Sequence, residues 1–461
     1  MSLAASARIR WTSLSIAVLV IAIVVAAALG VLSVDVTWLA LVAAVAVLAL
    51  SFLLRDPMIL PVLAVPATIV QTRVGSALSV SDLVLAAATF VAVFQLRGRG
   101  SGTMRPIIWA GIAYLATALP TLVLNRYSAN AVEWVHEVFL VLGSMAVGFV
   151  IGRENRARAA LTLYVVFCVG IGIVVIAVAG IGYLQTHQFA PVYLPDLQKN
   201  TTGGMLAVAA VIAFARPVWL RWSAGWSWMA AIVCMVGILA AQSRQGLIGA
   251  VVGILIVSIR ARPQTGRRVR IVWLAAIPAV VYVLGLVTSQ FKSGDQFNSA
   301  YQRVAWYEQS IEIWQKSPIF GVGMRWWYTD RFTTNFDLFQ PPNAELEVLT
   351  EVGVFGLIGF LAMFAVAGWF LWKMDPIYGT VGFAVVATRF VQGQFDIYWV
   401  AGQASLLWIV AGICYGVQEF DRARRERGEP APWEAVVVKI KGDDTHRRAL
   451  QNPVRTPHVQ R

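Results

Sequence analysis

The chain has 461 residues, of which 58% are hydrophobic and 13% are charged, whereas an average soluble domain has roughly 25% charged residues. A single water-soluble domain is excluded, because it could not bury so much apolar surface. The net charge of +13 would suit a nucleic-acid-binding protein, but the basic residues gather in the connections between apolar runs. That distribution follows the positive-inside rule of membrane proteins, so nucleic acid is not expected as a partner.

Apolar runs recur along the chain, and most are long enough to cross a hydrocarbon core of about 30 Å as a helix. We predict an all-α fold, a polytopic transmembrane helical bundle of about 14 spans (12 to 14). The predicted spans are 11–32, 35–54, 57–70, 79–96, 107–124, 134–151, 159–184, 203–215, 226–241, 245–259, 271–289, 352–372, 377–392 and 397–418. The runs at 57–70, 203–215 and 245–259 are short, and two of them could be re-entrant or broken helices.

The charge pattern also predicts three regions. A membrane domain covers 1–418, one long extracytoplasmic loop containing short helices is inserted at 290–351, and a basic, partly disordered cytoplasmic tail covers 419–461. Basic connections alternate with connections that carry few cations, which places both termini in the cytoplasm. Helical spacing over 301–315 predicts a helix in the loop that ends before Pro318. The Arg-rich tail is expected to contact anionic lipid headgroups.

Ionisable residues at the outer membrane surface are candidates for function, because they are costly there. Arg244 lies in Gln-Ser-Arg-Gln-Gly (242–246), which joins two apolar runs with almost no loop. Its guanidinium can bind a phosphate or diphosphate through two parallel hydrogen bonds. The alternative is an interfacial anchor whose charge snorkels to water. Arg303, at the start of the loop helix, has the same two interpretations.

A second candidate is Gly321-Val-Gly323-Met-Arg325, which Trp326 and Trp327 follow. Glycines permit tight turns close to a ligand, but so short a motif is weak evidence for phosphate binding. The two tryptophans could stack on sugar rings, although an aromatic belt at the membrane surface is the favoured interpretation.

A third candidate is the group of carboxylates before the span at 352–372. Glu347 and Glu351 share a face at helical spacing, and Glu345 points about 160° away from Glu347 if the helix already runs there. The alternative is a solvated first turn that the helix dipole favours. Lone His136 is interpreted as a satisfied buried group. No metal, serine-hydrolase or calcium motif occurs, so no metal or cofactor is predicted.

Four stretches in order resemble the O-antigen ligase and O-antigen polymerase superfamily. They are 196–204, which contains Lys199; 242–246; 303–323, which ends in Ser-Pro-Ile-Phe-Gly-Val-Gly; and 342–359, which begins with Pro-Asn. The resemblance implies that a glycan moves from a polyprenyl diphosphate carrier to an acceptor hydroxyl on a glycan or lipid, with inversion and without a metal. The expected setting is the lipid bilayer of a bacterial plasma membrane, with the active site facing the extracytoplasmic side.

The resemblance also implies site residues. Arg244 and Arg303 match the family arginines that engage the donor diphosphate, and Arg325 and Lys199 are further donor-binding candidates. Trp326, Trp327 and Asp337 are candidates for binding substrate.

The base departs from the family pattern. Family members commonly have His-Asn where this chain has Pro342-Asn343, and proline cannot accept a proton. We assign catalysis to Glu345 with Asn343, because a carboxylate can act as a base. Asp337 and Glu347 remain alternatives. Two further accounts stay open: activation that depends mainly on leaving-group departure, and a member that is not a transferase of the usual kind.

Competing functions remain. Ligase and polymerase are not distinguished, and a flippase or transporter of a lipid-linked glycan or other solute is the alternative class. The few charges within the spans lie near the outer half, which favours an outward site over a conduit; they are Asp82, His136, Glu137, Arg389 and Asp396. A non-catalytic scaffold, with the tail recruiting a cytoplasmic partner, is a third hypothesis.

Overall fold

The computed structural model describes residues 55–74, 78–96, 102–260, 285, 299–329, 340–399 and 402–434. The chain divides into two compact units, Met1–Leu60 and Pro61–Arg461, and the site described below lies in the second. The predicted spans at 11–32 and 35–54, most of the span at 271–289, Asp337 and the tail from 435 onward lie outside the described residues.

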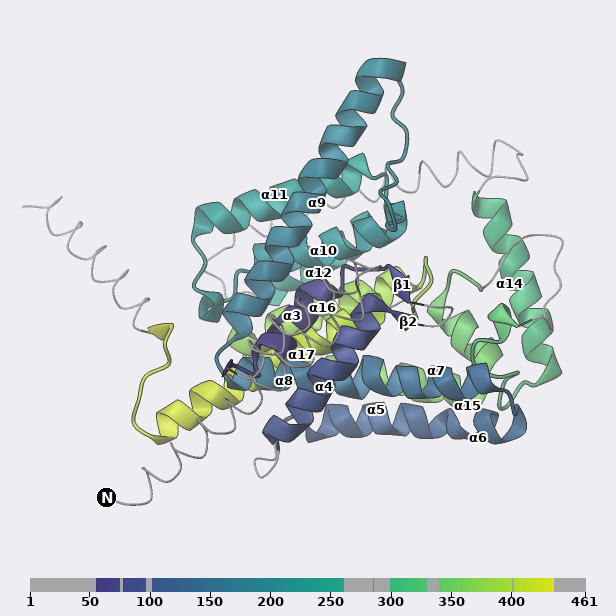
Figure 1. Cartoon of the computed structure of the whole chain (residues 1–461), viewed down its shortest axis with the longest axis horizontal. Coiled ribbons are helices and arrows are strands. Elements are labelled where there is room, and N and C mark those ends of the chain that lie inside the picture. The colour runs from purple at the N-terminus through teal and green to yellow at the C-terminus, as the bar shows by residue number, and fades with distance from the viewer. Residues whose placement is uncertain are drawn as a thin grey trace, which may run out of the picture. The chain divides into compact units, whose positions relative to one another are not determined.

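The described part of the chain is mostly helical, as predicted (Figure 1). Its α-helices are α3 (Ile59–Ala67), α4 (Val80–Leu96), α5 (Arg105–Thr117), α6 (Leu119–Leu124), α7 (Ser128–Val138), α8 (Ser144–Arg153), α9 (Ala157–Thr186), α10 (Lys199–Ala215), α11 (Ala224–Ala240), α12 (Arg244–Arg260), α14 (Ser299–Lys316), α15 (Ala344–Lys373), α16 (Pro376–Gly393) and α17 (Gln403–Glu426). A π-helix, η1 (Phe139–Gly143), joins α7 to α8, and short 3₁₀ turns are η2 (Val218–Leu220) and η4 (Trp326–Tyr328). The strands β1 (Arg73–Val74) and β2 (Leu78–Ser79) pair antiparallel.

Four helical stretches among the described residues are long and apolar enough to cross a membrane. They are Arg105–Leu124, Ser128–Arg153, Ala157–Thr186 and Ala344–Lys373. α4, α10 and α11 are shorter apolar helices, and α3, with nine residues, is only about 14 Å long. These helices indicate a membrane-embedded protein, while the total of 12 to 14 spans stays a prediction.

Glycines set the closest helix packing. α8 and α17 lie so close that a Cβ on Gly148 would come within 2.0 Å of the Ile409 carbonyl oxygen, and one on Gly416 within 2.1 Å of the Phe149 carbonyl oxygen. Small residues allow such backbone contact, which is typical of helix pairs in membranes. α15 packs along α5 and against α16 (Figure 1).

Several boundaries differ from the prediction. α15 begins at Ala344, well before 352, because the Asn343 side chain accepts a hydrogen bond from the Leu346 amide at 2.9 Å and caps the helix. Gly353 interrupts α15 with a φ of 75°. α17 continues past 418 to Glu426, into the region predicted as tail. α14 confirms the helix predicted over 301–315 and ends at Lys316, while the extracytoplasmic loop around it stays a prediction.

Candidate functional site

The Gln-Ser-Arg-Gln-Gly motif forms the N-terminus of α12. Ser243 accepts a hydrogen bond at its hydroxyl oxygen from the Gly246 amide at 3.3 Å, which caps the helix and makes Arg244 its first residue. Gly246 permits a close approach to α10, since a Cβ there would lie 2.7 Å from the carbonyl carbon of Gly203. The motif therefore places Arg244 beside the N-terminus of α10.

Lys199 is the first residue of α10 and precedes its apolar stretch. The Gln245 amide nitrogen donates to the Asn200 carbonyl at 3.0 Å, so the starts of α10 and α12 are joined directly. Burial lowers the pKa of Lys199, and the positive charges of Arg244 and Arg303 lower it further. Three predicted donor-binding cations therefore share one neighbourhood, which we call the cationic cluster (Lys199, Arg244 and Arg303).

The connection between α16 and α17 meets this cluster. Arg303, on α14, donates from Nη2 to the Phe395 carbonyl at 2.9 Å. Gln245 Nε2 donates to the Asp396 carboxylate at 2.7 Å. The partial burial of Asp396 raises its pKa above the usual value, although the Gln245 hydrogen bond and the charges of Arg389 and Arg303 act in the opposite direction. A short segment between two apolar helices thus contacts both α12 and α14.

The start of α15 reaches the same segment from another direction. Asn343, which caps α15, donates from Nδ2 to the Gln394 carbonyl at 3.3 Å, and the Gln394 side-chain amide donates to Glu345 Oε1. The other carboxylate oxygen, Glu345 Oε2, is buried without a hydrogen-bond partner among the described residues. The structure therefore brings Glu345 and Asn343 to the same connection that Arg303 and Gln245 contact.

The electrostatics of this arrangement favour an anion. The starts of α12 and α15 contact residues 394–396, and Gln245 links the start of α10 to the same segment. The N-terminus of a helix carries a partial positive charge. The cationic cluster adds three full charges. Such a combination is a ready site for a phosphate or diphosphate.

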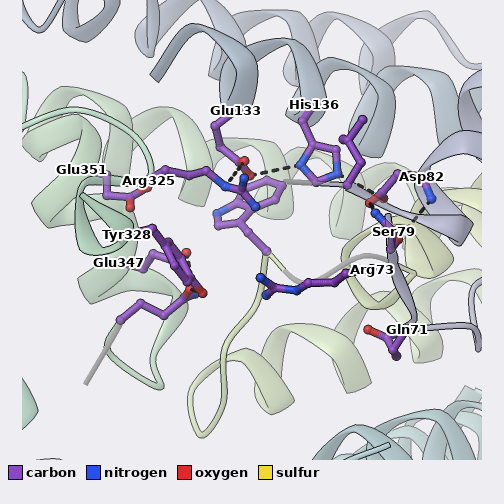
Figure 2. Close-up of a pocket in the computed structure, with 13 residues that line it drawn as sticks. Gln71, Arg73, Ser79, Asp82, Glu133, His136, Arg325, Tyr328, Glu347 and Glu351 are labelled. Carbon is purple, nitrogen blue, oxygen red and sulfur yellow. Dashed lines mark hydrogen bonds and ion pairs between the residues drawn. The ribbon is translucent and has the colours of Figure 1, made fainter. Parts of the chain in front are cut away.

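A polar pocket lies on the other face of the α15 N-terminus (Figure 2). Glu347 and Glu351 both line it, which confirms that they share a face, and Glu345 is not among its lining residues. The pocket has a volume of about 50 Å³, room for a few water molecules but not for a sugar ring. It is lined by Gln71, Arg73, Leu78, Ser79, Asp82, Glu133, His136, Arg325, Tyr328, Gln340, Glu347, Glu351 and Trp399.

His136 lies between two carboxylates of this pocket (Figure 2). Its Nε2 is 3.1 Å from Asp82 Oδ1, and its Nδ1 is 3.2 Å from Glu133 Oε1. All three side chains are buried. Because each ring nitrogen faces a carboxylate, the imidazole is suited to donate from both nitrogens as a cation. His136 is therefore a buried group that faces carboxylates on both sides, although its Nε2 has no hydrogen-bond partner in the part of the chain that the structure describes. It is poorly placed to act as a base.

Arg325 belongs to the polar pocket rather than to the cationic cluster. Its Nε is 2.6 Å from Glu133 Oε2. The turn before it is held by α7 and α15, because the amides of Val322, Gly323 and Met324 donate to the Thr350 carbonyl, the Glu351 carbonyl and the Asn130 side chain, respectively. These amides are therefore not available to a phosphate, so this turn does not form a phosphate-binding loop.

The remaining predicted substrate-binding residues are also placed. Trp326 and Trp327 are buried and pack with Ile313 and Val322, which gives them a packing role in this structure. Next to them, burial raises the pKa of Tyr328 to about 12. Asp337 lies outside the described residues.

Sequence reasoning did not assign a site role to Gln245 or to residues 394–396. The available signals were the polar run Gln-Phe-Asp between two apolar runs and the second glutamine of the 242–246 motif. Sequence spacing alone could not show that these residues meet, because their partners come from distant parts of the chain.

A family model described as O-Antigen ligase matches residues 229–361. The matched segment includes Arg244, Arg303, Asn343 and Glu345, and it excludes Lys199 and residues 394–396. A comparison with curated proteins finds no match.

Proposed function

We propose that this chain, which its matched segment places in the O-antigen ligase and polymerase superfamily, moves a glycan from a polyprenyl diphosphate carrier to an acceptor hydroxyl. The observation that carries the proposal is the gathering of Lys199, Arg244 and Arg303 where the starts of α12 and α15 meet residues 394–396, with the start of α10 linked through Gln245. This arrangement would bind the donor diphosphate and neutralise the charge that develops as it leaves. We infer that a divalent metal is not required for that task.

The proposed reaction is an inverting displacement. The acceptor oxygen attacks the anomeric carbon while the bond from that carbon to the diphosphate oxygen breaks, and the bonding pair stays with the diphosphate. Glu345 Oε2 would take the proton of the acceptor hydroxyl, because this oxygen has no partner among the described residues and its carboxylate is held by Gln394 next to the cluster. Asn343 would fix the helix start that carries Glu345.

The structure supports a narrower donor site than the sequence suggested. Lys199, Arg244 and Arg303 enter the proposal, whereas Arg325 is ion-paired with Glu133 and both tryptophans are buried in packing. The acceptor would be a glycan or a lipid at the outer face of the bacterial plasma membrane, and the two choices correspond to polymerase and ligase.

The test is glycan transfer by the full chain in nanodiscs, with polyprenyl diphosphate-linked glycan and with release of polyprenyl diphosphate as the readout. Glu345→Gln should abolish transfer and keep donor binding, and Arg244→Ala should weaken donor binding. Glu347→Gln tests the alternative base, since Glu347 lies on the same helical turn as Glu345 but faces the polar pocket. Glu308→Gln, on an exposed part of α14, serves as the control for a surface carboxylate.

Each outcome separates hypotheses. Full transfer by Glu345→Gln would refute its role as base, and loss in Glu347→Gln alone would move that role to Glu347. Tight donor binding by the unmodified chain without turnover, with the acceptor varied between glycans and lipids, would contradict the transferase proposal and favour a flippase or carrier.

A further inference from the structure

One buried arginine, Arg389, forms hydrogen bonds with residues on both sides of the connection between α16 and α17. Arg389, on α16, is 2% exposed. It donates from Nη1 to the Gln392 side chain at 2.6 Å and from Nε to the Gln403 carbonyl at 3.1 Å. Because these two partners lie on opposite sides of residues 394–396, the guanidinium closes the connection into a braced loop.

The middle of that loop joins elements that carry the cationic cluster. Asp396 accepts from Gln245 at 2.7 Å, and the same Gln245 amide nitrogen donates to the Asn200 carbonyl on α10. The neighbouring Phe395 carbonyl accepts from Arg303 of α14. One side chain, Gln245, thus links the starts of α10 and α12 to the carboxylate beside the Arg303 contact.

The Asp396 carboxylate lies where its negative charge offsets the repulsion among the cations of the cationic cluster. Three cations gathered without a bound anion repel one another, and the charges of Arg244 and Arg303 act on Lys199 in that way. The Asp396 charge attracts Arg303 and Arg389, while its hydrogen bond to Gln245 fixes the direction of the α12 N-terminus. The effects of the charge and of the hydrogen bond can be measured separately, because Asp396→Asn keeps a hydrogen-bond acceptor and removes the negative charge.

We propose that Asp396 is a positioning residue of the donor site, which orients Arg244 and Arg303 through Gln245 and the Phe395 carbonyl and partly balances the cluster charge while the site is empty. This inference rests on the proposed function. It predicts opposite effects for two substitutions at one position. Asp396→Ala removes the acceptor for Gln245 and loosens the cluster, whereas Asp396→Asn keeps an acceptor and leaves the cluster more positive.

The experiment measures the Kd of inorganic pyrophosphate for the full chain in nanodiscs, by calorimetry at constant ionic strength. We expect Asp396→Ala to raise Kd about tenfold, the loss expected for a hydrogen bond to a charged group, and Asp396→Asn to lower it about threefold because one opposing charge is gone. Gln245→Ala should raise Kd at least as much as Asp396→Ala, because it removes the same hydrogen bond and keeps the opposing charge. The double variant should bind no more weakly than Gln245→Ala, since the two residues share that hydrogen bond.

The outcomes distinguish this inference from the proposed function. If pyrophosphate binding by the unmodified chain does not depend on Arg244 and Arg303, the proposed donor site is wrong. If binding depends on both arginines but Asp396→Ala is unchanged, or Asp396→Asn weakens binding as much as alanine does, the positioning role is refuted. Should Asp396→Ala fail to fold, Asp396→Asn and Gln245→Ala still decide: tighter binding in the first and weaker binding in the second support the role, and any other pair of results contradicts it.

Discussion

Arg325 and Glu133 form a close ion pair, with 2.6 Å between Nε and Oε2 and with 18% and 5% of the side chains exposed, respectively. The pair joins the turn after α14 to α7, and Glu133 also contacts His136. A row of adjacent charged side chains therefore runs from Asp82 on α4, through His136 and Glu133, to Arg325 in the turn that precedes α15. The Gly-Val-Gly turn and its arginine serve packing at this point of the structure.

The first prediction concerns this pair. Arg325→Ala leaves Glu133 buried without its guanidinium, and removing one partner of a buried ion pair costs about 3 kcal/mol. We expect a clear drop in Tm, measured by thermal unfolding in detergent. Replacing both members, as in Arg325→Met with Glu133→Gln, should recover much of the loss. Equal Tm values for Arg325→Ala and the unmodified chain would show that the pair does not stabilise the fold.

The second prediction concerns the break in α15. Gly353 has a φ of 75°, and a Cβ there would lie 2.3 Å from the Ile319 carbonyl oxygen. Gly353→Ala adds backbone strain of about 1–3 kcal/mol and a clash with main chain, so we expect poor folding yield or a strongly lowered Tm. Gly182→Ala in α9 is the matched control, because nothing lies within 4 Å of its Cβ and alanine favours a helix. A Gly353→Ala chain as stable as the control would contradict this reading of the break.

The third prediction separates charge from geometry at Arg303. Arg303→Lys keeps the charge but has no planar fork, so it cannot hold the Phe395 carbonyl and a phosphate oxygen in the same way. Donor affinity should fall about tenfold, with a smaller loss than in Arg303→Ala, and binding of the polyprenyl diphosphate-linked glycan measures both. Equal affinity for lysine and arginine would mean that Arg303 acts only as a point charge.

The fourth prediction is a pH dependence. Burial raises the pKa of Asp396 in the folded state above its unfolded value of 3.8. The contribution of this group to the free energy of unfolding is therefore fully present below about pH 4 and is lost as the pH rises through the folded-state pKa. The side chain of Asp396→Asn cannot ionise, so the Tm of this variant should fall less than that of the unmodified chain as the pH rises above about 4. Parallel Tm profiles would show that Asp396 does not titrate with a raised pKa.

The sequence predicted the helices well because their apolar runs are long and continuous. Helix positions for α9, α11 and α14 follow directly from the periodic or apolar pattern. The start of α15 was missed, because its first residues are polar and the helix depends on the Asn343 cap. The end of α17 was missed for a related reason, since its charged last turns resemble a tail.

Some residues of the candidate site could be selected from the sequence because of their residue type alone. Arg244 and Arg303 stood out as cations at the ends of apolar or amphipathic runs. The partner of Arg325 was not predictable, because Glu133 comes from α7 and no spacing relates the two. The same holds for Asp396 and Gln245, whose contact appears only when α12 and the connection after α16 are assembled.

The proposed donor site is not formed by one continuous stretch of chain. Its helix starts come from α10, α12 and α15, and the loop that joins them follows α16. A fragment limited to 229–361, the part that the O-antigen ligase family model matches, would contain Arg244, Arg303 and Glu345 but neither Lys199 nor Asp396. Chimeras between relatives that exchange only this segment would therefore pair one protein's arginines with another protein's loop, and they should be built with 196–204 and 389–403 exchanged together.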